Sequence, residues 1–205
     1  MSRPERQQEL VNPRQLFVIS GPSGVGKNTV AAELCRRGLA VRAVTATSRE
    51  PRPGEEDGAD YLFISEDEFE RWIEEGRLLE YTRYVGNYYG TPVESVNRAA
   101  AEGLPVLLTI DVDGGLQIKR RWPEVTLIFL EPPSERELRR RLEARGRDED
   151  ESIERRLRRA RQEMEYAERY DHRVVNDRLE DALSRIQRIM EKRYPIDANQ
   201  PRPEG

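Results

Sequence analysis

Residues 16–29 read LFVISGPSGVGKNT. The opening run, Leu16–Ser20, is apolar and has the length of a buried strand, whereas the residues from Lys27 to Arg37 have a helical pattern. Between them the chain is rich in glycine and follows the spacing GxxxxGK, the Walker A pattern, in the strand, loop and helix context that this pattern requires. The stretch therefore predicts a loop that binds the phosphates of a nucleotide.

The predicted phosphate loop indicates ATP as its ligand. Its glycines let backbone N–H groups and the helix N-terminus face a polyphosphate, while Lys27 reaches the β- and γ-phosphates. A glycine-rich turn with an incidental lysine is the alternative, and it leaves the complete spacing unexplained. The residues that we expect to contact ATP are Gly21, Pro22, Ser23, Gly24, Val25, Gly26, Lys27, Asn28 and Thr29.

Asn28 departs from the usual pattern, because a Ser or Thr that contacts Mg²⁺ normally follows the lysine. Its side-chain carbonyl oxygen could ligate the metal or accept a hydrogen bond from a metal-bound water. Thr29 follows directly but points elsewhere on a helix. We therefore expect turnover that depends on Mg²⁺, with Asn28 meeting the ion through water.

Two further apolar runs, Pro105–Ile110 and Val125–Leu130, alternate with helical patterns. This alternation predicts an α/β fold in which a parallel sheet is covered by helices on both faces. A late, short strand at Arg173–Val175 is expected to join the sheet. The fold class is thus a P-loop NTPase-type core.

Residues 45–91 differ in composition from the predicted core, because they are rich in aromatic residues, Gly and Pro. We expect them to form an inserted subdomain. Ser65 and Glu68 form a capping box before a helix, and Thr91 is expected to cap the helix that returns to the core. Residues 134–161, dense in Arg and Glu, predict a helical lid joined near Gly146. The core is then built from residues 15–44, 92–133 and 162–194, and residues 1–14 and 195–205 are expected to fray.

Composition narrows the classes of partner. With 35 basic and 39 acidic residues the formal net charge is −4, so no overall positive field favours nucleic acid. The longest apolar runs are strand-length and the first residues lack a secretory apolar segment, which predicts a cytoplasmic protein without a membrane partner. The sequence has only one cysteine, Cys35, and one histidine, His172. These numbers exclude an internal disulfide and a clustered Cys/His metal site.

Three segments downstream of the phosphate loop carry a resemblance. They read TATSREPRPGE (45–55), DGADY (57–61) and GNYYGT (86–91). Together with the loop they strongly resemble the guanylate kinase family, over a span from about Leu16 to Arg193. The resemblance implies transfer of the γ-phosphoryl group of ATP to GMP, with GMP held in the insert.

The resemblance also implies an acceptor site. Arg49 and Arg52 match the arginines that hold the acceptor phosphate, and guanidinium groups suit a dianion because each forks two hydrogen bonds. Glu80 matches the glutamate that accepts hydrogen bonds from N1–H and N2–H₂ of guanine, a donor pair that adenine lacks. The further matching positions are Tyr61 and Tyr89 for the phosphate, Thr45 and Thr91 for guanine, and Asp111 near GMP and the metal.

Each of these residues has a plainer reading by itself. Arg49 and Arg52 could be surface charges in a proline-rich loop, and Glu80 an exposed strand residue. Asp111 could simply cap the helix after its strand. The family also often carries an aspartate where this chain has Thr109, and a glutamine where it has Asp113.

Three arginines, Arg141, Arg145 and Arg156, match those that gather around the transferring phosphoryl group in the family. Eleven arginines lie between Arg136 and Arg161, so most of them are expected to be solvated partners of glutamates. Asn176 matches a segment beside the adenine ring, although a turn residue is an alternative.

Two rival functions remain at this point. A guanylate-kinase-like binding module would recognise a protein, and a related P-loop kinase would phosphorylate another acceptor such as a ribose bisphosphate. The presence of Lys27, Arg49, Arg52 and Arg156 favours an enzyme, and Glu80 with Tyr61 and Tyr89 favours guanine. The sequence leaves open whether dGMP is also a substrate and whether the chain is a monomer or a homodimer.

Overall fold

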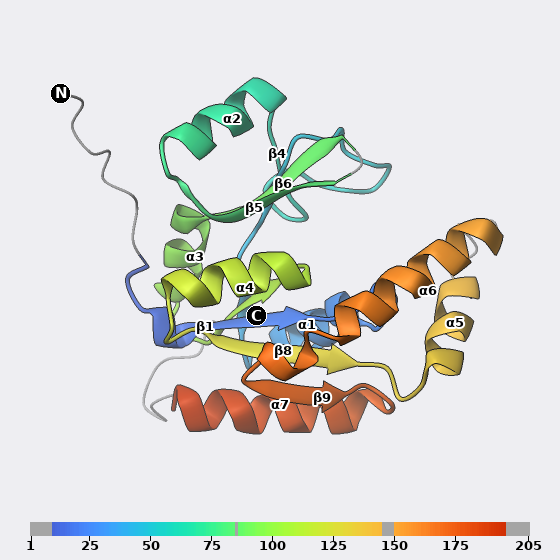
Figure 1. Ribbon diagram of the computed structural model, residues 1–205. Coiled ribbons are helices and arrows are strands. Elements are labelled where there is room, and N and C mark those ends of the chain that lie inside the picture. Colours follow the sequence, from blue (N-terminus) through green and yellow to red (C-terminus); the bar gives the residue numbers. More distant parts are fainter. Residues whose placement is uncertain (1–9, 85, 145–149, 196–205) are drawn as a thin grey trace.

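The computed structural model describes residues 10–84, 86–144 and 150–195. A five-stranded parallel sheet forms the core, in the order β2-β7-β1-β8-β9 (Figure 1). Three strands lie where the apolar runs predicted them: β1 (Leu16–Ser20), β7 (Val106–Thr109) and β8 (Thr126–Glu131). The late strand β9 (His172–Val175) pairs with β8 as expected, and β2 (Val41–Arg42) was too short to predict.

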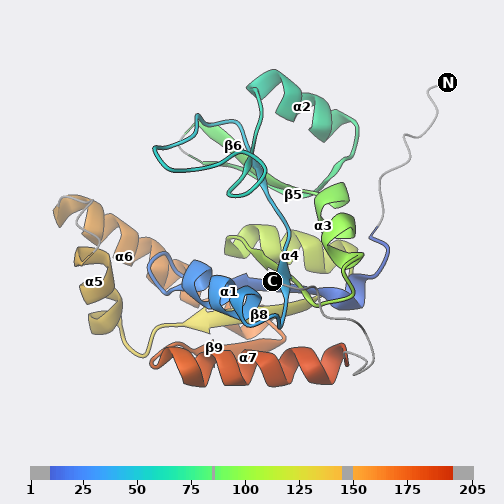
Figure 2. The ribbon, with the colours of Figure 1, turned by 180° about the vertical axis from the view of Figure 1, so that it is seen from behind.

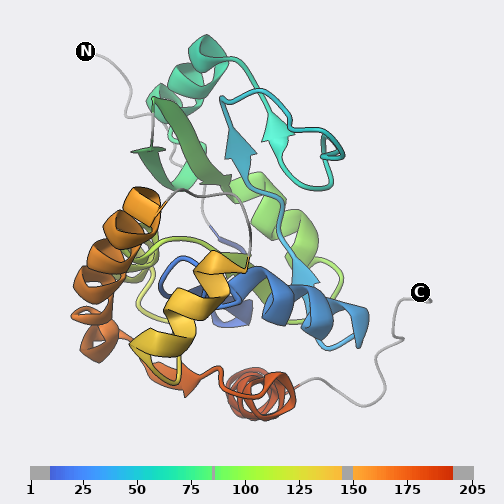
Figure 3. The ribbon, with the colours of Figure 1, turned by 90° about the vertical axis from the view of Figure 1, so that its right-hand side faces the viewer.

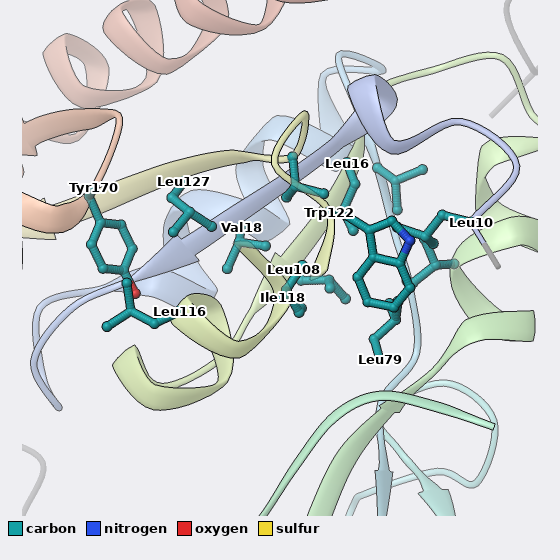
Figure 4. Close-up of a cluster of buried hydrophobic side chains, with 14 of the residues drawn as sticks. Leu10, Leu16, Val18, Leu79, Leu108, Leu116, Ile118, Trp122, Leu127 and Tyr170 are labelled. Atoms are coloured by element: carbon teal, nitrogen blue, oxygen red, sulfur yellow. The ribbon is translucent and has the colours of Figure 1, made fainter. Parts of the chain in front are cut away.

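Helices cover both faces of this sheet, as the alternating pattern predicted. In β1 the side chains of Phe17 and Ile19 pack against α1 (Lys27–Arg36) and α7 (Leu179–Arg193). Leu16 and Val18 point to the other face, toward α3 (Val93–Ala100) and α4 (Val112–Arg121). The second of these clusters is drawn in Figure 4. Burial on both faces explains why the strands read as unbroken apolar runs.

The segment before β1 is more ordered than expected. Leu10 is buried in the cluster of Figure 4, and the N–H of Val11 donates to Oδ1 of Asn97 at 3.0 Å. A 3₁₀ turn, η1 (Pro13–Gln15), then leads into β1. Part of the segment expected to fray, residues 10–14, thus contacts the core, and a short apolar stretch of this kind has no periodicity to reveal its burial.

A second, four-stranded sheet stands apart from the core, in the order β4-β3-β6-β5 (Figures 1 and 2). Its strands are β3 (Ala46–Thr47), β4 (Leu62–Phe63), β5 (Leu78–Tyr84) and β6 (Asn87–Pro92), and β5 and β6 form an antiparallel hairpin. Helix α2 (Glu66–Glu74) begins at Ser65, whose side chain accepts from the N–H of Glu68 as predicted. Phe69 and Trp72 pack the helix onto this small sheet.

The predicted cap at Thr91 is wrong. Thr91 belongs to β6, and α3 begins at Val93 after Pro92 without a side-chain cap. Its hydroxyl donates instead to Oε1 of Glu80 on β5, at 2.7 Å. The pairing of two strands, which the local capping pattern does not reveal, decides the direction of this side chain.

The arginine-rich segment forms two helices, α5 (Glu135–Glu143) and α6 (Asp150–Met164), followed by η2 (Ala167–Arg169) (Figure 3). Ser134 caps α5 by accepting from the N–H of Glu137, as its capping box predicted. Leu138 and Leu142 of α5 pack with Ile153 and Leu157 of α6, so these charged helices share a small apolar core. The predicted joint near Gly146 lies outside the described residues.

Candidate active site

A cavity of about 340 Å³ lies where the core sheet, the small sheet and α6 meet. Its floor is at the carboxyl ends of β1 and β7, the edge at which open α/β sheets bind ligands. The residues that line it come from five parts of the chain: Gly21, Ser23, Lys27 and Asn28; Thr45 and Tyr61; Glu80, Thr82, Tyr84, Tyr89 and Gly90; Thr109, Ile110 and Asp111; and Arg156, Arg159 and Glu163.

Glycine conformation shapes the phosphate loop. Gly21, Gly24 and Gly26 have φ values of 146°, 89° and 100°, which L side chains rarely adopt. A Cβ atom on Gly21 would lie 2.2 Å from the carbonyl oxygen of Leu130, so the loop passes directly over the end of β8. The backbone is thereby held in a curve that presents its N–H groups and the start of α1 to an anion.

Lys27 and Asn28 lie at the cavity, whereas Thr29 does not line it. The ammonium of Lys27 donates to the carbonyl oxygens of Gly21 and Pro22 at 2.6 and 3.1 Å. These bonds hold the positive charge at the mouth of the loop. Thr29 is exposed on α1, in agreement with its position one residue further around the helix.

Asn176 and Arg141 lie behind the phosphate loop, away from the cavity lining. The side-chain amide of Asn176 donates to the carbonyl oxygen of Val25 at 2.8 Å, and Nη2 of Arg141 donates to the carbonyl oxygen of Asn176 at 3.0 Å. A Cβ atom on Gly26 would meet Nδ2 of Asn176 at 2.7 Å. The buried Asn176 therefore braces the loop, and Arg141 braces Asn176.

Arg156, one of the three arginines predicted to act in transfer, lines the cavity. Its Nη2 donates to Oγ of Ser23 at 2.8 Å, which joins α6 to the phosphate loop. Arg145, the third arginine predicted to act in transfer, lies outside the described residues. Most other described arginines of α5 and α6 pair with glutamates, as expected; Arg140, for example, bonds Glu137.

Glu80 is buried, with only 4% of its surface exposed, so its reading as an exposed strand residue is wrong. Burial raises the pKa of its carboxyl to about 7, against the opposing effect of the Thr91 hydrogen bond, and the charge of Asp111 raises it further. A Cβ atom on Gly114 would lie 2.7 Å from Oε2 of Glu80, so glycine at that position lets the carboxyl group approach α4. Close to neutral pH this carboxyl can thus be either proton donor or acceptor.

Asp111 is both a helix cap and a cavity residue. Its Oδ1 accepts from the N–H of Gly114 at 2.8 Å and so caps α4, while the residue also lines the cavity. Thr109, where the family often has an aspartate, lines the cavity beside it, and Asp113 does not. The acidic residues that line the cavity are Glu80, Asp111 and Glu163.

Thr45, Tyr61 and Tyr89 line the cavity from the small sheet. The rings of Tyr61 and Tyr89 meet edge to face, with centroids 6.3 Å apart. This contact fixes the two rings against each other and leaves their hydroxyl groups as the polar ends of the pair.

Arg49 and Arg52 are not among the residues that line the cavity. Both arms of the Arg49 guanidinium donate to the carboxylate of Glu55, each at 2.7 Å, and the plane lies over the ring of Tyr61 at 5.1 Å. The same carboxylate accepts from the backbone N–H of Arg52, whose side chain is exposed. These bonds lower the pKa of Glu55 to about 2, so a carboxylate occupies the fork of Arg49 at neutral pH.

Seven cavity residues were not among the predicted site residues: Gly90, Thr109, Ile110, Thr82, Tyr84, Arg159 and Glu163. For the last four of these a signal exists in spacing. Thr82 and Tyr84 follow Glu80 by two and four residues on one strand, and Arg159 and Glu163 follow Arg156 by three and seven on one helix. Once one residue of each element is placed at the cavity, its periodicity identifies the others.

Within the described ranges, no group of three or more His, Cys, Asp or Glu side chains is arranged to hold a metal ion. No helix in that same part of the chain is long and apolar enough to cross a membrane. Asn28, Thr109 and Asp111 are among the lining residues whose side chains carry oxygen atoms. Such hard donors suit Mg²⁺, which binds through one or two protein groups when nucleotide phosphates and water supply the rest.

Comparison with known proteins gives a consistent result. The family model described as guanylate kinase matches residues 13–193. A guanylate kinase from Gloeobacter violaceus is 52% identical over 183 residues, covering 88% of this chain and 89% of that protein. One from Thermus thermophilus is 49% identical over 170 residues, covering 83% and 77%. The crystal structure of guanylate kinase from Anaplasma phagocytophilum matches with a TM-score of 0.69 and 31% identity, covering 90% of this chain and 87% of that one. The chain belongs to the guanylate kinase family.

Proposed function

We infer that this protein is an ATP:GMP phosphotransferase, which converts ATP and GMP into ADP and GDP. The observation that carries the inference is the composition of one cavity, to which the phosphate loop contributes Lys27 and the small sheet contributes Glu80. A nucleotide triphosphate on one side and a guanine on the other would direct their phosphates toward each other. Phosphoryl transfer needs this alignment and neutralisation of charge more than covalent help.

Guanine is the base that Glu80 and its neighbours suit best. As a carboxylate, Glu80 can accept from both N1–H and N2–H₂, while Thr91 supports Oε1. Adenine presents no such donor pair, and a pocket that leaves a buried carboxylate unpaired discriminates strongly against it. We propose that Thr45 and Asp111 complete the guanine side, and that dGMP is accepted as well.

The acceptor phosphate requires a rearrangement in this proposal. Tyr61 and Tyr89 already line the cavity, whereas Arg49 is bound by Glu55 behind Tyr61. We propose that the phosphate of GMP draws Arg49 and Arg52 inward, because a dianion competes well with a single carboxylate for a guanidinium fork. Residues 45–91 would act as the GMP-binding unit in this movement.

On the ATP side, Lys27 and the loop backbone would hold the β- and γ-phosphates, with Asn176 and Arg141 keeping the loop in shape. Arg156, and Arg145 with it, would neutralise the moving phosphoryl group. Closure of residues 134–161 over the cleft would exclude water and limit hydrolysis of ATP. The enzyme would work in the cytoplasm, where both nucleotides are available.

We propose Mg²⁺ as the metal that accompanies ATP. Asn28 would hold it through a bound water, with Asp111 nearby, which fits the oxygen donors of the cavity. When bound, the ion would neutralise charge on the β- and γ-phosphates.

A panel of acceptors tests this function. ADP formation should be fast with ATP and GMP in Mg²⁺, and at least about 100-fold slower with AMP, UMP or no acceptor, because only guanine pairs with Glu80. EDTA should abolish turnover. Equal rates with and without GMP would contradict the proposal, and binding of GMP without turnover would favour a binding module instead.

A further inference from the structure

Strand β5 presents a row of three side chains to the cavity. Glu80, Thr82 and Tyr84 occupy alternate positions, which point to the same face of a strand, and all three line the cavity. The buried Glu80 lies at one end of the row and the half-exposed Tyr84 at the other. This row belongs to the proposed GMP side.

Helix α6 presents a second row from across the cleft. Arg156, Arg159 and Glu163 lie three and four residues apart in turn, so they share one face of the helix, and they also line the cavity. Arg156 ties this face to the phosphate loop through Ser23. Nε of Arg159 donates to Oε1 of Glu163 at 2.8 Å, which fixes the plane of its guanidinium.

The two rows meet at Arg159 and Tyr84. Cζ of Arg159 lies 5.1 Å from the centroid of the Tyr84 ring, within the range of a cation–π contact. Arg159 comes from α6, in the segment predicted to form the lid, and Tyr84 comes from β5 of the small sheet. One helix therefore contacts the phosphate loop through Arg156 and the acceptor strand through Arg159.

We propose that Arg159 and Tyr84 are a pair of positioning residues that hold the acceptor strand at a fixed distance from the helix carrying Arg156. The proposal rests on the proposed function, since it assigns the pair to the approach of GMP toward ATP. Without the contact, part of the binding energy of GMP has to bring β5 toward α6. Loss of the contact therefore raises the KM for GMP and leaves the ATP site unchanged.

A direct contact between Arg159 and the transferring phosphoryl group is the competing role. It would make Arg159 act without Tyr84, because the ring carries no charge to place on a phosphate. Loss of such a transition-state contact lowers kcat by about 100-fold or more. Loss of a positioning contact at a partly exposed site should be far smaller, about two- to fivefold.

A double-mutant cycle in the full chain separates these roles. Arg159→Gln and Tyr84→Leu should each raise the KM for GMP about two- to fivefold and leave kcat within about twofold. The double variant should be no worse than the more severe single variant, because both changes remove the same contact. Tyr84→Phe, which keeps the ring, should behave as the unchanged protein.

Matched controls come from the same two elements. Arg158→Gln changes an exposed arginine of α6, and Tyr81→Leu changes an exposed tyrosine on the other face of β5; neither residue lines the cavity. Both should leave the KM for GMP unchanged. The proposed pairing would be contradicted if the effects of the two test variants were additive. It would also be contradicted if Arg159→Gln alone slowed turnover about 100-fold. Absence of GMP phosphorylation in the unchanged protein would instead remove the proposed function itself.

Discussion

The two halves of the cavity are built in different ways. The phosphate loop is made largely of backbone, in which glycines at positive φ hold the curve and a single ammonium, that of Lys27, adds charge. The small sheet contributes side chains from separate strands, such as Glu80 on β5 and Thr91 on β6. The shape of the loop is thus set by its own backbone, whereas on the acceptor side Arg49 is held by Glu55. Changes on the first side should therefore damage transfer, and changes on the second should damage recognition of GMP.

The largest expected effect is on the loop. Lys27→Met removes the ammonium while the loop glycines remain, so kcat should fall about 100- to 1000-fold and the KM for GMP should change little. Steady-state rates of ADP formation measure both. If the main defect of Lys27→Met were instead a raised KM for GMP, the two halves of the cavity would not have the separate roles described above.

Glu80→Gln should have the next largest effect, on the other half. The amide keeps one acceptor but turns an NH₂ toward the donors of guanine, so the KM for GMP should rise about 100-fold, and the KM for ATP should not change. Initial rates against each nucleotide give the two values. Glu74→Gln, a change at an exposed position of α2, is the matched control. Unchanged kinetics with GMP would remove Glu80 from the site.

The acceptor half should also respond to pH. Because burial raises the pKa of Glu80 to about 7, the neutral acid predominates below that pH, whereas the proposed hydrogen bonds from guanine require the carboxylate. Affinity for GMP should therefore fall as the pH is lowered through 7, by about tenfold between pH 7 and 6 at most, with a proton released on binding.

Calorimetry in two buffers of different ionisation enthalpy measures that proton. The phosphate of GMP titrates in the same range. Because Glu80→Gln lacks only the carboxyl group, any proton release that remains in this variant comes from the phosphate. Equal pH dependence in both proteins would show that Glu80 does not titrate on binding.

Asn28→Ser should have the smallest effect. Placing the usual hydroxyl there should leave the Mg²⁺-dependent rate equal or raise it a few-fold, because in the proposed arrangement the asparagine would meet the ion only through water. Rates over a Mg²⁺ titration give the comparison. A loss of about 100-fold would assign Asn28 a dedicated role that a hydroxyl cannot fill.

The same contrast explains how much the sequence alone could predict. Leu16–Thr29 carries strand, loop and helix in one stretch, so local spacing was enough to identify the phosphate loop and the parallel core. Glu80 looked like an exposed strand residue by itself, because its burial depends on Thr91 and on the absence of a side chain at Gly114. Non-local contacts of this kind leave no periodic signal.

Some contacts could not be anticipated from any pattern. Glu55 forms an ion pair with Arg49 within one loop. The sequence of that loop shows only that both residues are charged. Arg159 was one of eleven arginines in its segment, and its meeting with Tyr84 depends on how α6 lies against the small sheet. The resemblance to a known family identified matched positions, but residues particular to this chain required the structure.

The central claim is that the two halves form one site with ATP and GMP facing each other. A bisubstrate analogue, in which adenosine and guanosine are joined through their 5′ oxygens by a chain of phosphates, tests it most directly. We expect competitive inhibition against both ATP and GMP, with affinity well above that of either nucleotide and dependent on the length of the phosphate chain. Competition with only one of the two, or no dependence on chain length, would contradict it.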